Sequence, residues 1–444
     1  MTKSFRQIVG LLATLLFFSA CQKIDWINHG ENGNGNIGHT GRYTSEVAQK
    51  WIQMQLRVIQ SAPPLPTLNG RYMGYVGTTL YESVVPGMPG YQTLSGQLNG
   101  LPALPTPTHG RSYHWPSSVN GAMASIIRNL YSTASVAMKA SIDSLENALN
   151  TIYQGEVGAE TFQRSADFGK SIAQIVFDWS KTDGTYEARP PYMPPVGDGL
   201  WAPTPPGFGP AVQPYLGLHR TLVAGSLVGT APPPPPAYST EATSDFYKMV
   251  KEVYDVSQAL TPEQTATALY YRDNPGLQGG GGPYLAILYQ LLQIENPQLD
   301  WAAIAYAKFG IAGADAWVGC WQIKYQYNVM RPIKYIREVL LHPDWNPLFG
   351  TPPHPDYPSG HSTGGGAAEE VLTGLLGNNY SFTNHAYDYL GMPPQTYSNF
   401  ADMAMQIGKS RVYAGIHYTL SCEEGRLQGK LIARNVEKKL KFHK

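Results

Sequence analysis

The chain has 444 residues and carries 32 basic and 32 acidic side chains, so its formal net charge is zero. A nucleic-acid-binding protein usually shows a basic excess, so this balance disfavours nucleic acid as a partner. Three cysteines in a chain of this length exclude a disulfide-dense scaffold. Beyond Cys21, the sequence allows one bridge between Cys320 and Cys422, and it allows two buried free thiols equally well.

The first residues have the layout of an export signal. Two basic residues precede an apolar run from Ile8 to Phe18, and a pair of small residues leads into Cys21. The run is shorter than the roughly 20 residues of a bilayer-spanning helix. We therefore predict that residues 1–20 are a signal peptide and that Cys21 is the lipidated N-terminus of the mature chain, its only attachment to the cell envelope. Plain secretion after cleavage nearby is the alternative.

Helical periodicity dominates the rest of the chain. Residues 21–44 are rich in Asn and Gly and predict a flexible tether. From Glu46 onward, apolar residues recur at helical spacing, while the alternation typical of strands is scarce, so we expect an all-α body. Besides the helix that begins near Glu46 and one around 122–130, helices are predicted at about 135–154, 158–180, 241–257, 262–272, 284–295, 299–341, 362–376 and 398–439.

A stretch rich in Pro, Gly and aromatic residues, 189–238, lies between two predicted helical halves, 45–240 and 241–444. It includes the run Trp201 to Gly207 and the five prolines Pro232 to Pro236. Proline lacks the amide donor and clashes with the preceding turn, so no helix continues through this stretch. Its aromatic residues suit burial, so we expect an ordered wrap across the body; a plain domain linker is the alternative.

Three short stretches of the C-terminal half combine groups that bind a tetrahedral oxyanion. The first holds Lys324 and Arg331, whose spacing of seven would place both side chains on one face of a helix, with a kink or helix end at Pro332. A solvated basic stripe is the alternative for this pair taken alone. The second is Pro358-Ser359-Gly360-His361 at the start of a predicted helix, where unpaired amides favour an anion. The serine there could instead serve only as a helix cap, and the histidine as a capping or surface residue.

The third stretch places Arg411 six residues before His417. On a regular helix these side chains would diverge, so a break is needed for both to face one anion, and Gly415 is the expected place for it. The three stretches together offer three cations, one hydroxyl, one glycine amide and two imidazoles. Guanidinium and ammonium groups suit the oxygens of an oxyanion, and the imidazoles could sit at its two poles.

In this order and spacing, the three stretches resemble the signature shared by vanadium-dependent haloperoxidases and the type 2 phosphatidic acid phosphatase superfamily of acid phosphatases. Likeness to bacterial haloperoxidase-like members extends over Trp201 to Gly207, His354 to Gly366 and Gly415 to Tyr418. The resemblance implies an all-α helical bundle of that type. It covers most of the mature chain and is strongest after Trp317.

The resemblance also implies a role for each site residue. His417 would bind vanadium, or attack phosphorus in a phosphatase, and His361 would be the acid–base group at the opposite apex. In a haloperoxidase, with vanadate as cofactor and peroxide and halide as substrates, Lys324 would polarise the peroxide and halide attack would yield a hypohalous acid equivalent. In a phosphatase, which needs no such cofactor, a phosphate ester would leave a phosphohistidine. The equatorial oxygens would be held by Lys324, Arg331, Ser359, Gly360 and Arg411.

Residues around the cluster bear on the choice between these two activities. Trp321 matches an aromatic residue that haloperoxidases place beside vanadate, and His354 lies where algal bromoperoxidases have a histidine and chloroperoxidases an aromatic residue. Against the peroxidase, Tyr271 and Pro283-Tyr284 stand where many bacterial members have a tryptophan and a histidine. Asp273 would pair with Arg411, as an aspartate does in the family, with a surface position as the alternative.

Two rival interpretations use other features. Residues 360–364 spell a Gly-x-Ser-x-Gly nucleophile elbow with Ser362 as the nucleophile, but an elbow needs a buried strand before the serine, and the proline-rich run 352–358 cannot be one. A lipid-anchored ligand-binding module without catalysis is also conceivable, because 29 Tyr and 9 Trp offer surfaces on which sugars stack, although most of them are expected in the core.

Overall fold

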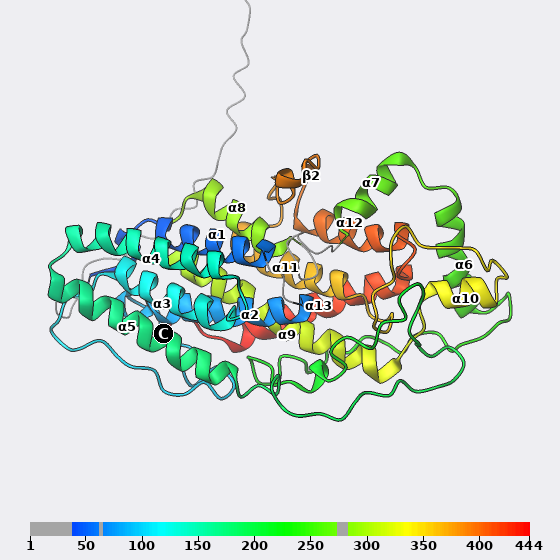
Figure 1. The fold of residues 1–444 in the computed structure, drawn as a ribbon, viewed down its shortest axis with the longest axis horizontal. Helices are drawn as coiled ribbons and strands as arrows, with labels where there is room; N and C mark the ends of the chain where they lie inside the picture. Colours follow the sequence, from blue (N-terminus) through cyan, green and yellow to red (C-terminus); the bar gives the residue numbers. More distant parts are fainter. Residues whose placement is uncertain (1–37, 62–64, 273–282) are drawn as a thin grey trace, which may run out of the picture. The chain divides into compact units, whose positions relative to one another are not determined.

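Helices form nearly all of the regular structure in the computed structural model, which describes residues 38–61, 65–272 and 283–444 (Figure 1). The described residues belong to one compact unit. The predicted signal peptide, Cys21 and residues 22–37 of the predicted tether lie outside the described residues, as does Asp273. Within the described ranges, each helix is too short or too polar to cross a bilayer.

The all-α prediction is confirmed, with one small antiparallel strand pair in which Thr383 faces Thr396. The α-helices are α1 (Glu46–Ser61), α2 (Pro66–Glu82), α3 (Trp115–Leu130), α4 (Val136–Glu156), α5 (Ala159–Ser180), α6 (Asp245–Gln258), α7 (Pro262–Tyr270), α8 (Tyr284–Glu295), α9 (Leu299–Tyr327), α10 (Pro332–Glu338), α11 (Gly360–Leu376), α12 (Phe400–Tyr413) and α13 (Thr419–Lys439). The strands are β1 (Phe382–Asn384) and β2 (Gln395–Tyr397), and short 3-10 turns lie at Thr40–Arg42, Val85–Gly87, Leu216–Leu218 and Asp388–Leu390.

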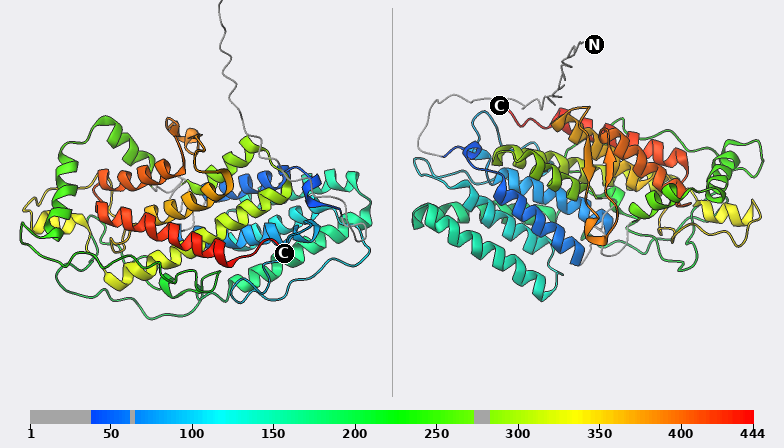
Figure 2. Two further views of the ribbon diagram at one scale, coloured as in Figure 1. Left: turned by 180° about the vertical axis from the view of Figure 1, so that it is seen from behind. Right: turned by 90° about the horizontal axis from the view of Figure 1, so that it is seen from above.

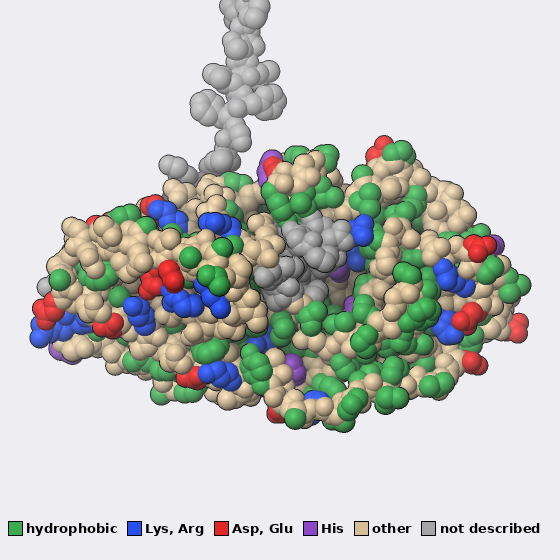
Figure 3. Space-filling view, viewed as in Figure 1, with side chains coloured by type: hydrophobic (Ala, Val, Ile, Leu, Met, Phe, Trp, Pro, Cys, Tyr) green, Lys and Arg blue, Asp and Glu red, His purple; other side chains and the backbone are tan. Residues whose placement is uncertain are grey.

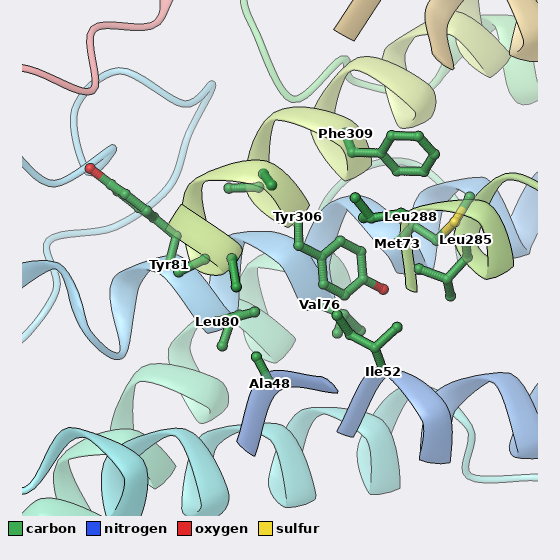
Figure 4. Close-up of a cluster of buried hydrophobic side chains, with 14 of the residues drawn as sticks. Ala48, Ile52, Met73, Val76, Leu80, Tyr81, Leu285, Leu288, Tyr306 and Phe309 are labelled. Atoms are coloured by element: carbon green, nitrogen blue, oxygen red, sulfur yellow. The ribbon is translucent and has the colours of Figure 1, made fainter. Parts of the chain in front are cut away.

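The core is built around the crossing of α2 and α9, which touch through their backbones. A Cβ atom at Gly310 would lie 2.2 Å from the Met73 carbonyl oxygen, and one at Gly77 would lie 2.5 Å from the Tyr306 carbonyl oxygen. Glycine alone permits this approach. Apolar side chains of α1 and α8 cover the crossing, as Figure 4 shows for Ile52 and Leu288. The contact therefore fixes α9, the helix that carries Lys324.

A second close-packed group, α11, α12 and α13, adjoins α9 (Figure 2). A Cβ atom at Gly429 would lie 1.9 Å from the Thr363 carbonyl oxygen, and one at Gly425 would lie 2.7 Å from the Ser359 carbonyl oxygen. The two glycines of α13 thus let the first turns of α11 lie directly against it. This packing sets the position of the Ser359–His361 segment.

The stretch 189–238 is irregular apart from one 3-10 turn, and it is anchored to the loops around the site. Trp201 is buried, its backbone N–H donates to the Asn328 carbonyl, and Leu200 pairs with Val329 in an isolated antiparallel bridge. Further along, the Val212 N–H donates to the Pro353 carbonyl at 2.9 Å. The stretch is therefore an ordered wrap over the body.

The predicted helix over 299–341 is wrong in one important respect. α9 ends at Tyr327 because Asn328 adopts the left-handed conformation, with φ 48°, and Pro332 begins α10. Proline suits the first position of a helix, since the amide it lacks has no partner there. Lys324 and Arg331 therefore lie on different elements, and the argument from one shared helix face fails. The extended backbone of Arg331, rather than helical spacing, directs its side chain.

Candidate active site

Lys324 lies in the last turn of α9 and is fully buried, with 0% of the residue exposed. Its Nζ donates hydrogen bonds to the carbonyl oxygens of Pro355 and Asp356, each at 2.8 Å. Burial lowers the pKa of Lys324 to about 7, because the ammonium form is poorly solvated there. An anion beside Nζ would favour the charged form and offset this cost.

Arg331 is the N-cap residue of α10 and is also fully buried. Its Nε donates to the His354 carbonyl at 2.8 Å, and its Nη1 donates to the Ile416 carbonyl at 2.7 Å. Burial lowers its pKa to about 10, which leaves it charged at neutral pH. One guanidinium thus ties together the loops before α11 and before α13.

The N-terminus of α11 faces the same place. Ser359 is its N-cap, and its Oγ accepts from the Ser362 N–H at 3.4 Å, so the capping role considered from the sequence is present in the structure. Gly360 lets the backbone pack closely on two indole rings, because a Cβ atom there would come within 3.1 Å of Trp317 and 3.2 Å of Trp321. The following amides of the first turn and the helix dipole favour an anion at this end.

His361 lies in the first turn of α11 and lines the pocket described below. Burial, with the charges of Arg411, His417, Lys324 and Arg331 added, holds the pKa of His361 well below its usual range. The imidazole is therefore neutral at physiological pH, and an anion bound beside it would raise its pKa and favour proton uptake.

Arg411 and His417 converge because α12 ends between them. The helix stops at Tyr413, and Gly415 has φ +76°, the break expected from the sequence. Arg411 Nη1 donates to the Tyr271 carbonyl at 2.6 Å. His417 is buried, and its Nε2 lies 3.1 Å from Nη1 of Arg331.

Asp356 is a site residue that the sequence argument missed. It is fully buried, its Oδ1 lies 3.0 Å from His417 Nδ1 and 3.7 Å from Arg331 Nη1, and Ser421 donates to its Oδ2. Burial raises the pKa of Asp356 to about 6, so the carboxyl is largely ionised at neutral pH. A carboxylate at Nδ1 favours the imidazole tautomer with its proton on that atom, which puts the lone pair on Nε2, where a ligand would replace the 3.1 Å contact with Nη1 of Arg331. The sequence feature that could have indicated Asp356 is its position two residues after His354, in the loop before Ser359.

The electrostatic balance of this cluster calls for an anion. Lys324, Arg331 and Arg411 are buried together, whereas Asp356 is the one carboxylate found in the cluster within the described residues. Burial and the charges of the two arginines and the lysine also hold the pKa of His417 well below its usual range, so the imidazole is neutral. Buried charges are costly unless paired. An oxyanion such as vanadate therefore fits the donor set and the helix N-terminus.

A pocket of about 660 Å³ leads to the cluster. His361, Arg411, His417 and Gly360 are part of its wall, while Lys324, Arg331 and Ser359 are not and lie buried behind it. Much of the remaining wall comes from the wrap, Thr204–Gly209 with Val212, and from the loop Phe349–His354. The wall also includes Leu65, Thr67, Arg272, Trp317 and Trp321. Figure 3 shows a hollow on one face of the molecule with histidine side chains inside it.

The structure places Trp321 and His354 beside the cluster, with their ring centroids 5.0 Å apart. Lys324 Nζ lies 5.7 Å from the Trp321 ring centroid, and Nδ1 of His354 is 3.1 Å from Arg331 Nη2. Burial, reinforced by Lys324 and Arg331, holds the pKa of His354 well below its usual range. Their roles in catalysis stay predictions.

Two alternatives from the sequence can be compared with the structure. Ser362 is buried within α11, and residues 352–358 before it form no strand, so the nucleophile elbow is excluded. Cys320 and Cys422 are both buried free thiols.

The chain is similar to known proteins in part of its sequence and in its fold. Residues 305–443 match a family model described as the VCPO second helical-bundle domain. The chain is similar to the crystal structure described as the first bacterial vanadium-dependent iodoperoxidase, at 29% sequence identity and a TM-score of 0.81, over 94% of this chain and 99% of that chain. No curated protein matches it.

Two bacterial vanadium-dependent chloroperoxidase structures share the fold. The holo form has 16% identity and a TM-score of 0.62, over 92% of this chain and 99% of that one. The apo form has 15% identity and a TM-score of 0.58, over 85% and 95%. The family model covers Lys324 through His417, and the likeness to the iodoperoxidase extends over almost the whole chain. The chain therefore has the fold of these vanadium-dependent haloperoxidases, and its residues 305–443 match the family model.

Proposed function

We propose that this protein is a vanadate-dependent haloperoxidase that oxidises a halide with hydrogen peroxide to a hypohalous acid equivalent. The observation that carries the proposal is the buried cluster of Lys324, Arg331 and Arg411 around a neutral His417 whose Nδ1 faces a carboxylate. The names of the similar structures, an iodoperoxidase and two chloroperoxidases, support the same activity.

Each residue of the cluster would have a separate role in the reaction. Nε2 of His417 would bind the vanadium, and the cationic groups with the amides at Gly360 would hold the oxygens of vanadate. When bound, vanadate supplies a Lewis-acid centre that activates hydrogen peroxide toward attack by a halide. An ammonium has three N–H donors, and Lys324 uses two on backbone carbonyls, so the third can point at a bound oxygen. The neutral imidazole of His361 would accept the proton that hydrogen peroxide loses.

A second candidate is an acid phosphatase, because the same donors would hold a phosphoryl group. The contact between Asp356 and His417 Nδ1 also suits a nucleophile, since it orients Nε2 for attack on phosphorus. In that case His417 would form a phosphohistidine, His361 would protonate the leaving alkoxide, and no vanadate would be required.

The deciding experiment compares purified protein with and without added orthovanadate. We expect peroxide-dependent oxidation of iodide or bromide only with vanadate, lost in His417→Ala and kept in His385→Ala, which changes an exposed histidine. Hydrolysis of a phosphate monoester that vanadate inhibits would favour the phosphatase instead. Absence of both activities, with sugar binding unchanged in His417→Ala, would favour the lipid-anchored ligand-binding module.

We further propose that the protein is exported and anchored in the cell envelope through a lipid on Cys21. The layout of residues 1–20 supports this location. In cells labelled with a palmitate analogue, the wild-type chain should carry label and the Cys21→Ser variant should not. Equal labelling of the two proteins would refute the anchor.

A further inference from the structure

Arg272 places a fourth cation at the wall of the active-site pocket, outside the cluster described above. It follows the end of α7 and lines the same pocket as Arg411. Its guanidinium carbon lies 5.2 Å from the ring centroid of Phe349, and that of Arg411 lies 5.5 Å from the same centroid. One aromatic ring therefore contacts a cation of the oxyanion cluster and a cation outside it.

Backbone and side-chain contacts fix the position of the Phe349 ring between Arg272 and Arg411. The N–H of Leu348 donates to the Ala414 carbonyl at 3.0 Å, and the Phe349 ring packs on Ala268, Ala414 and Ile416. These contacts come from the ends of α7 and α12, the same elements that position the two arginines. The distance from one guanidinium to the other is therefore set by packed structure and cannot exceed the sum of the two ring distances.

The described wall of the pocket carries two guanidinium groups, Arg272 and Arg411, and no carboxylate. None of the described residues in the wall is acidic, and Arg272 makes no ion pair with any residue in the described ranges. Two residues after Phe349, Oγ1 of Thr351 is buried in the pocket wall and has no hydrogen-bond partner. A cleft with charge of one sign and apolar walls concentrates ions of the opposite sign.

We propose that Arg272, Phe349 and Thr351 form an outer anion site that holds the halide before it reaches Arg411. The choice of halide rests on the proposed haloperoxidase function; the anion site itself rests on the geometry. Guanidinium is weakly hydrated, so it pairs well with a large halide such as iodide, and the positive edge of an aromatic ring and a hydroxyl hydrogen complete a suitable set of contacts. Arg272 acts on halide capture and is not a catalytic residue.

Quenching of tryptophan fluorescence by iodide tests the site in vanadate-free protein. Trp317 and Trp321 line the pocket and are 5% and 3% exposed, so iodide held there should quench them. Their contribution is the part of the quenching that disappears in a Trp317→Phe, Trp321→Phe background. At low ionic strength, Arg272→Gln should lower the iodide quenching of Trp317 and Trp321 about two- to threefold. The reason is that the variant loses the attraction between one positive charge and iodide across several ångströms of water.

Three controls make the result specific. Arg272→Lys keeps the charge and should retain most of the quenching, whereas Arg272→Gln should not. Arg111→Gln removes the same charge from a side chain that is 58% exposed and outside the pocket wall, and it should have no effect. Acrylamide is neutral and should quench all variants equally. Iodide quenching that is the same in Arg272→Gln and Arg111→Gln would overturn the proposal, as would an equal loss of acrylamide quenching.

Steady-state kinetics of iodide oxidation distinguish the outer anion site from the proposed haloperoxidase activity. In vanadate-loaded protein, Arg272→Gln should raise KM for iodide about two- to threefold with kcat nearly unchanged, and added salt should reduce the difference. A lowered kcat with an unchanged KM would refute a role in capture. If no halide oxidation occurs in the wild type while quenching still depends on Arg272, the anion site stands and the haloperoxidase function fails.

Discussion

Replacing Asp356 with asparagine tests whether this carboxylate prepares His417 for its ligand. Oδ1 of Asp356 lies 3.0 Å from Nδ1 of His417, and both side chains are buried. Removing the charged partner of a ligating histidine typically costs about 10- to 100-fold in affinity. Orthovanadate binding should therefore weaken by about that factor, or roughly 1.4–2.8 kcal/mol. The amide keeps the volume of the carboxyl, so we expect the fold to survive.

Calorimetric titration of vanadate-free protein with orthovanadate measures this change, and thermal unfolding verifies that the variant is folded. The matched control is Ser421→Ala, which removes the hydroxyl that donates to Oδ2 of Asp356 and leaves Oδ1 facing His417. Its affinity should fall much less than that of Asp356→Asn. A folded Asp356→Asn protein that binds vanadate as tightly as the wild type would refute the orienting role.

Three further predictions concern stability. Gly310→Ala should destabilise the protein by about 1–3 kcal/mol in urea unfolding, because the new Cβ would lie 2.2 Å from the Met73 carbonyl oxygen. Gly313→Ala should stabilise it by about 0.5–1 kcal/mol, because a Cβ there would have nothing within 4 Å. Equal effects of the two variants would contradict the close crossing of α2 and α9. Burial raises the pKa of Glu82 from 4.5 to about 7, so the folded state binds its proton more tightly. Stability should therefore fall by up to about 3 kcal/mol as pH rises from about 4.5 to 7, and a slope that persists in Glu82→Gln would exclude this cause. Orthovanadate at 100 times its Kd should stabilise the folded protein by about 2.7 kcal/mol, and an unchanged Tm would argue against the binding site.

The helices could be predicted from sequence where an apolar face repeats over several turns, as in α4 and α5. The division between α9 and α10 could not be predicted from the sequence, because it depends on the backbone conformation of a single asparagine. Asn328 enters the left-handed region without the signal that a glycine would give. Pro332 was interpreted as a kink or a helix end, and it begins a helix. Proline occurs at all these places, and only the conformation of the preceding backbone distinguishes them.

The candidate site was predicted through family resemblance more than through physical argument. Spacing along the chain could suggest the break at Gly415, because glycine is the residue that most easily adopts a positive φ. It could not reveal Asp356, which lies in a segment without periodicity, or Arg272, which lies at the end of the helix predicted over 262–272. Their importance depends on which elements pack against those segments, and that information is tertiary.

The way the cluster is supported explains how its charges are held together before an anion arrives. Lys324 is held by two backbone carbonyls and Arg331 by two more, so these side chains are oriented by neutral dipoles rather than by carboxylates that would compete with the ligand. Carbonyl dipoles offset part of the cost of burying a cation without cancelling its charge. Among the described residues, Asp356 supplies the one carboxylate of the cluster, and its Oδ1 lies 3.0 Å from His417 Nδ1, closer than its 3.7 Å to Arg331 Nη1. Because the donors are already in place, binding an oxyanion requires little reorganisation, which is the condition under which fixed charges stabilise a transition state most.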